Sequence, residues 1–176
     1  MSYLWGMKNY KLILPVALLA LAACSQSTMK TDGTTASDST VVTAANADMA
    51  LYATMKIQEN IKVGDSVLLR FTVYNPADSA KQFCKWHTPF EPLMSKYLNI
   101  TDEKGDEVAY KGAMAKRMMP PPASAYLSLN AKDSTAVTVD LLKGYAISKP
   151  ARYKVVYEGQ NMSGLIVKDS VFFNYK

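Results

Sequence analysis

The chain has 176 residues with 20 basic and 15 acidic side chains, for a formal net charge of +5. The lysines are scattered among the acids and form no basic run, so the composition argues against a nucleic-acid-binding protein. Residues 49–176 are long enough for one domain with one core, and they contain no internal repeat.

Residues 1–23 predict a lipoprotein signal peptide that forms a signal helix. Lys8 and Lys11 precede the apolar run Leu12–Ala23, which is too short to cross a bilayer, since crossing takes roughly twenty residues. Small residues before Cys24 complete a pattern that resembles a bacterial lipoprotein signal. The resemblance implies cleavage before Cys24, whose acylated thiol would anchor the chain in the lipid bilayer. An uncleaved helical anchor and an ordinary secretory signal are the alternatives, and Met7 is an alternative start.

Residues 24–48 predict a lipidated N-terminus followed by a flexible, disordered linker. Ser25 after the cysteine resembles the outer-membrane sorting choice of Gram-negative lipoproteins, so we expect an anchor in the outer membrane facing the periplasm. The stretch Ser25–Asp48 consists mostly of Ser, Thr, Ala and Asp, which cannot bury enough apolar surface to offset chain entropy. Alternatively, Val41 and Val42 join an edge strand.

Residues 49–176 show the period-two alternation that is typical of β-strands. The clearest run has its apolar side chains on one face, at Val67, Leu69, Phe71 and Val73. Turn residues such as Asn75-Pro76 and Asp102–Asp106 separate this run from others of similar length. We therefore predict an all-β fold, an antiparallel immunoglobulin-like sandwich of seven to nine strands, with a closed barrel as the alternative.

Further strands are expected at 97–101, 107–111, 125–129, 134–141, 152–157 and 170–175, with a short helical turn between 141 and 148. The pair 97–101 and 107–111 should form a hairpin, because Gly105 tolerates a positive φ. Once Cys24 is acylated, Cys84 is the remaining thiol, so we expect no intramolecular disulfide.

Several segments of the domain, in their order along the chain, resemble one protein family. They include Lys85-Trp86-His87-Thr88-Pro89-Phe90-Glu91, then Lys116-Arg117, then Tyr145–Pro150. The pattern is similar to the N-terminal (pro-)domain of deuterolysin and peptidyl-lysine metalloendopeptidases. Those enzymes bind zinc through two histidines four residues apart, whereas this chain has one histidine. The resemblance therefore implies a noncatalytic module without the zinc domain, and we expect no enzyme activity and no cofactor.

The resemblance also points to a protein partner, with a protease as one candidate that the module would mask, chaperone or position. Its most specific stretch and the later basic pair supply the candidate contact residues: Trp86, Thr88, Pro89, Phe90, Glu91, Lys116 and Arg117. Trp86 has two readings, since it could pack between the sheets or anchor the loop that follows it. The prolines after Arg117 favour an extended segment, which either is a solvated linker or docks a partner.

Two other kinds of site deserve comparison. A nucleophile–base pair of Cys84 and His87 is disfavoured, since residues three apart on a strand lie about 10 Å apart and on opposite faces. We expect Cys84 to be buried beside Trp86. No metal site is expected, but a periplasmic copper(I) site built from soft ligands is an alternative, with His87, Met94, Met114, Met118 and Met119 as its residues. A purely structural envelope lipoprotein is the remaining alternative.

Overall fold

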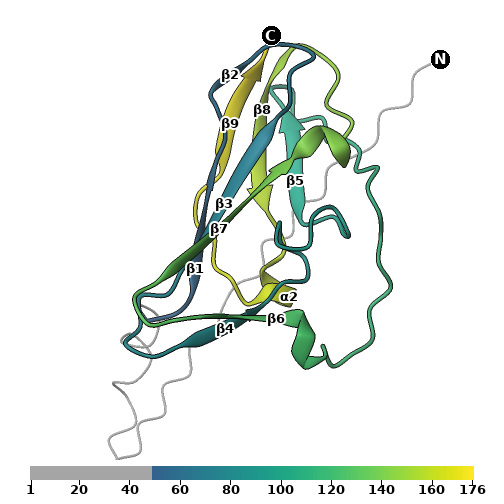
Figure 1. Cartoon of the computed structure of the whole chain (residues 1–176). Helices are drawn as coiled ribbons and strands as arrows, with labels where there is room; N and C mark the ends of the chain where they lie inside the picture. Colours follow the sequence, from purple (N-terminus) through teal and green to yellow (C-terminus); the bar gives the residue numbers. More distant parts are fainter. Residues whose placement is uncertain (1–48) are drawn as a thin grey trace, which may run out of the picture. The chain divides into compact units, whose positions relative to one another are not determined.

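The computed structural model describes residues 49–176, and the signal peptide, the lipidation site Cys24 and the linker predicted at 1–48 lie outside the described residues. In the described part, short strands form two packed layers (Figure 1). The strands are β1 Tyr52–Lys56, β2 Asn60–Ile61, β3 Leu68–Tyr74, β4 Lys81–Cys84, β5 Leu98–Asp102, β6 Tyr126–Leu129, β7 Ser134–Asp140, β8 Ala151–Tyr157 and β9 Val171–Tyr175. Their number agrees with the predicted seven to nine.

One layer has the strand order β1-β3-β7, and the other has the order β2-β9-β8-β5. All neighbours are antiparallel except β2 and β9, which run parallel. This parallel pair is a departure from the expected purely antiparallel sandwich. It arises because the chain leaves the first sheet after β1 and joins the opposite sheet as β2. The prediction of an all-β sandwich is confirmed.

The core lies between the two layers and follows the alternation in the sequence. Val67, Leu69, Phe71 and Val73 are completely buried, whereas Leu68 on the other face is 51% exposed. Burying each such side chain contributes roughly 1.5–3 kcal/mol, so this one strand fixes the orientation of its sheet.

The pair β3·β7 continues into a separate two-stranded sheet, β4-β6, which crosses one end of the sandwich (Figure 1). Asn75 is buried at the bend between the two pairs. Its amide nitrogen lies within hydrogen-bond distance of the carbonyl oxygens of Ser79 (2.8 Å), Leu129 (3.1 Å) and Asn130 (2.8 Å). The side-chain carbonyl oxygen of Asn75 accepts a hydrogen bond from the backbone amide of Ala77 at 3.1 Å. One side chain therefore holds both turns of the bend.

Three short helical turns connect the strands: η1 Ala123–Ala125, η2 Leu141–Lys143 and α2 Gln160–Ser163. The turn η2 confirms the helical turn expected after residue 141, and α2 was not predicted. The expected hairpin at 97–111 is reduced to β5 and a single bridge between Thr101 and Glu107, with Gly105 at φ 87° in the turn. Among residues 49–176, no helix is long and apolar enough to span a membrane.

Candidate protein-interaction site

The loop after β4 folds inward against the end of the sandwich. Thr88 is completely buried, and its hydroxyl donates to the Lys85 carbonyl at 2.6 Å while accepting from the Phe90 amide at 3.2 Å. These two hydrogen bonds direct Phe90 inward, where its ring packs edge-on against Phe71 and Phe83, with ring centroids 6.4 and 5.4 Å apart. The loop therefore packs against the core at the end of the sandwich and is not a free recognition loop.

Trp86 lies in a small second core beneath the β4-β6 sheet. It is 7% exposed and packs with Cys84 and Ala125, with Met162 of α2 against them. The prediction that Cys84 is buried beside Trp86 is confirmed. The prediction that Trp86 packs between the main sheets is wrong, because the bend at Asn75 carries β4 away from the sandwich. Of the two readings of Trp86, anchoring the following loop fits this position.

His87 connects this loop to β8 through its backbone. His87 has a left-handed φ of 57°, and its carbonyl oxygen accepts a hydrogen bond from the Tyr157 hydroxyl at 2.9 Å. Burial raises the pKa of Tyr157 to about 12, so the hydroxyl keeps its proton as a donor. Burial and the nearby Arg117 guanidinium lower the pKa of the His87 imidazole, against a smaller opposite effect of Glu91. The imidazole is accordingly neutral at pH 7.

Arg117 joins the loop to a distant part of the chain. Its guanidinium carbon lies 4.7 Å from the centroid of the Trp86 ring, and the same group forms an ion pair with the Glu91 carboxylate, including one hydrogen bond of 3.1 Å. The side chains of Arg117 and Glu91 are only 17% and 20% exposed. We call Arg117, Trp86 and Glu91 the arginine clamp. A stacked, forked guanidinium between two partners has a fixed orientation that a lysine could not provide.

The clamp holds an irregular segment, Ala113–Met119, at Arg117, two residues before the end of that segment, and we call it the methionine segment. At its other end the backbone pairs with the loop, since the amides of Ala113 and Ala115 donate to the carbonyls of Leu93 (3.1 Å) and Met94 (2.9 Å). The Tyr110 hydroxyl also donates to the Leu93 carbonyl at 2.7 Å. The methionine segment is thus held from Ala113 to Arg117 although it has no regular secondary structure, and Met118 and Met119 follow the clamp directly.

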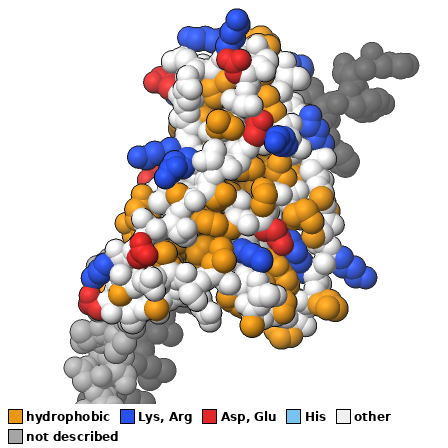
Figure 2. Space-filling view, viewed as in Figure 1, with side chains coloured by type: hydrophobic (Ala, Val, Ile, Leu, Met, Phe, Trp, Pro, Cys, Tyr) orange, Lys and Arg blue, Asp and Glu red, His pale blue; other side chains and the backbone are white. Residues whose placement is uncertain are grey.

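The side chains between these fixed points and directly after them face solvent. Met114, Met118 and Met119 are 72%, 84% and 67% exposed, and Lys116 is exposed between them. The chain carries no acidic residue from Val108 to Lys132. Figure 2 shows hydrophobic side chains lying among Lys and Arg at the end of the domain that carries β4 and β6. This surface is apolar and basic, and flexible thioether side chains adapt their shape to whatever they contact.

The candidate contact residues from the sequence fall into two groups. Trp86, Thr88 and Pro89 are buried and Phe90 packs inward, so these four do not present a surface to a partner. Glu91 and Arg117 are paired with each other, and Lys116 is exposed as expected.

Sequence reasoning considered the methionines as metal ligands and also placed Met118 and Met119 in the extended segment that either is a solvated linker or docks a partner, but it did not place Met114 on the same surface. Three large apolar residues inside a long acid-free run were the signal that could have shown it.

Two of the residues suggested for a copper(I) site, Met94 and Met114, lie on neighbouring stretches of backbone. Residues 49–176 contain no group of three or more His, Cys, Asp or Glu side chains that could hold an ion, a set that does not include methionine. The bond from Ala115 to Met94 brings Met94 and Met114 onto adjoining stretches of backbone, and both side chains are partly exposed. A soft-ligand site therefore stays a prediction.

Comparisons with known proteins bear on the fold. A family model described as an immunoglobulin-like domain matches residues 54–167. No curated protein matches the sequence. Among solved structures, a mutant β-glucosidase from Listeria innocua in complex with laminaribiose aligns at 12% identity and a TM-score of 0.38 over 72% of this chain. The β-glucosidase from Listeria innocua in complex with glucose aligns at 10% identity and a TM-score of 0.36 over 71% of this chain. This chain spans only 16% of those enzymes.

The CARDB domain of a Pyrococcus furiosus protein, solved in complex with di-metal ions, aligns at 12% identity and a TM-score of 0.30, covering 72% of this chain and 85% of that one. At these scores, the solved structures carry no argument about function.

Proposed function

Since this chain belongs to the immunoglobulin-like domain family, we propose that it is a membrane-anchored, noncatalytic protein-binding module of the bacterial cell envelope. In this proposal the acylated Cys24 holds the module in the outer membrane, and the methionine segment contacts a partner protein. The anchor rests on the lipoprotein-like signal in residues 1–23.

The observation that carries the proposal is an exposed apolar segment whose backbone is held from Ala113 to Arg117. A mobile loop would lose conformational entropy on binding, at roughly 0.5–1.5 kcal/mol for each side chain that becomes immobile. The backbone from Ala113 to Arg117 is already held by the bonds to Leu93 and Met94 and by the arginine clamp. Such preorganisation, together with exposed Met118 and Met119, favours a contact surface over a solvated linker.

The basic and apolar character of this surface defines the chemistry of the partner. With Lys116 exposed and no acid nearby in sequence, an acidic surface bearing apolar side chains is complementary. By the resemblance to metalloendopeptidase prodomains, an envelope protease is the leading candidate, and the module would mask, chaperone or position it.

The test is co-purification of the lipidated protein from native membranes, followed by assays of any recovered protease with and without the module. The informative variant replaces Met118 and Met119 by aspartate, with Leu68→Asp as a matched control, since Leu68 is an exposed apolar residue on the far side of β3. Loss of the partner only in the methionine variant supports the proposal. Equal recovery with both variants contradicts it.

Copper(I) handling is the second candidate function. It is favoured by the proximity of the Met94 and Met114 backbones, because thioethers are ligands that suit copper(I). Titration of the protein with copper(I) against a competing chelator tests it. Binding weaker than about micromolar would remove this function, since it corresponds to less than roughly 8 kcal/mol.

A further inference from the structure

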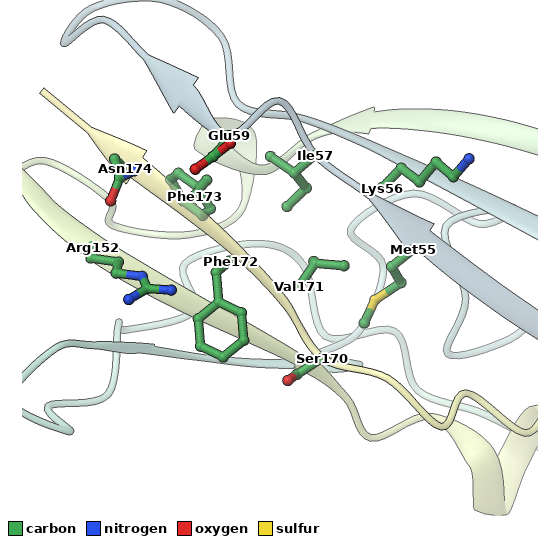
Figure 3. A pocket seen from close by; sticks show the side chains of 10 residues that line it. All are labelled: Met55, Lys56, Ile57, Glu59, Arg152, Ser170, Val171, Phe172, Phe173 and Asn174. Atoms are coloured by element: carbon green, nitrogen blue, oxygen red, sulfur yellow. The ribbon is translucent and has the colours of Figure 1, made fainter.

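An open groove lies where the chain crosses from one sheet to the other. It has a volume of about 650 Å³ and lies between the end of β1 and most of β9. Figure 3 shows Met55 and Ile57 on one side and Val171 and Phe172 on the other, with Arg152 beside Phe172. We call it the edge groove.

At Met55 on β1 and Phe172 on β9, the strand edges beside the edge groove carry backbone groups without a partner. The Ala53 amide donates away from β3, to the Ile166 carbonyl at 2.9 Å, so strand alternation directs the backbone groups of Met55 the same way. On β9 the Asn174 amide donates away from β8, to the Glu59 carbonyl at 2.7 Å. The backbone groups of Phe172, two residues earlier on the same strand, therefore also point away from β8. Ile166 and β2 therefore pair with other parts of these two edges, but within residues 49–176 no outward backbone hydrogen bond reaches Met55 or Phe172.

Five of the ten residues that line the edge groove are apolar: Met55, Ile57, Val171, Phe172 and Phe173. Met55 and Phe173 belong to the main core, with Ile57 and Val171 packed against it. Phe172 is 45% exposed, and the Arg152 guanidinium carbon lies 5.0 Å from the centroid of its ring. An unprotected edge of this kind attracts an added strand, because main-chain hydrogen bonds and alternate side chains are satisfied together.

We propose that the chain's own segment Thr40–Thr43 occupies the edge groove as an added edge strand. This segment has the sequence Thr-Val-Val-Thr, which is four consecutive β-branched residues. Val41 and Val42 are the one pair of adjacent large apolar side chains in Ser25–Asp48. β-Branched residues are those that strands prefer. The proposal is independent of the methionine segment and of any partner.

The length of the linker supports this occupant and fixes its direction. Only residues 44–48 separate Thr43 from Met49, so the segment reaches Met55 by folding back antiparallel to β1. At roughly 3.3 Å per residue, an extended stretch from Thr43 to Met49 covers about 20 Å, which equals the run from Met49 to Met55. Attachment by so short a connection gives an effective concentration on the order of millimolar, so a weak strand suffices.

Hydrogen exchange of the full chain, purified in detergent, tests the proposal. The amides of Met55 and Phe172 should exchange at least about tenfold more slowly in the wild type than in a variant with Val41→Asp and Val42→Asp, because strand pairing closes both edges. Met29→Asp, an apolar-to-acidic change elsewhere in the linker, is the matched control and should leave both rates unchanged. All three substitutions lie outside the folded domain, so loss of folding does not confuse the result.

Each outcome decides the proposal. Wild-type exchange at these two amides as fast as in the Val41→Asp, Val42→Asp variant overturns it, and so does an equal loss of protection in Met29→Asp. A disulfide trap gives a second reading: Val42→Cys should crosslink to Phe172→Cys within one chain, whereas Met29→Cys with Phe172→Cys should not. Crosslinks between two chains would assign the edge groove to a second copy and contradict the intramolecular strand.

Discussion

Replacing Arg117 by alanine should release the methionine segment from the domain. The substitution removes a partly buried stacking contact with Trp86, worth about 1 kcal/mol, and a forked ion pair with Glu91, worth about another 1 kcal/mol. It also leaves the Glu91 carboxylate, which is only 20% exposed, without its cation. We therefore expect the free energy of unfolding to fall by about 2 kcal/mol, at the upper end for a residue outside the main core.

Urea denaturation gives this change, and hydrogen exchange shows where it acts. The amides of Ala113 and Ala115 should lose protection in Arg117→Ala, while the strands of the main sandwich keep theirs. Lys116→Ala is the matched control, since Lys116 is the exposed neighbour. Arg117→Lys should give an intermediate loss, because an ammonium keeps the charge but not the flat fork. A stability equal to that of Lys116→Ala, with unchanged exchange, would refute the reasoning.

Three further outcomes follow from the contacts described. Burial and Arg117 lower the pKa of His87 in the fold, so the unfolded chain binds more protons than the folded chain as the pH is lowered from about 7 to 5. The free energy of unfolding should therefore fall over this range, and more steeply than in His87→Asn. Parallel plots of unfolding free energy against pH for the two proteins would count against this. Asn75→Ala should cost about 3 kcal/mol of unfolding free energy by thermal denaturation, because its hydrogen bonds hold both turns of the bend; a loss below about 1 kcal/mol would contradict that role. In Gly159→Ala the added Cβ would overlap the His87 carbonyl oxygen, so we expect a loss of about 2 kcal/mol or more of unfolding free energy. An unchanged thermal midpoint would contradict this expectation.

The sequence alone determined the sandwich, because burial acts on each strand locally. From Val67 through β3, the alternation of Val67, Leu69, Phe71 and Val73 with polar or exposed neighbours leaves one arrangement that removes all four from water. Turn residues act locally as well, as Gly105 shows with its positive φ. The helical turn near Leu141 was predictable for the same reason.

Only the tertiary structure decided which of the candidate residues reach the surface. The run Lys85–Glu91 looked like a recognition loop, yet Thr88 and Phe90 turn inward, because the bend at Asn75 leaves an open sandwich end that this loop fills. The pairing of Arg117 with Trp86 joins residues far apart in the chain, which no local pattern specifies. The edge groove likewise exists because β1 and β2 belong to opposite sheets, and sheet partnership is a long-range property.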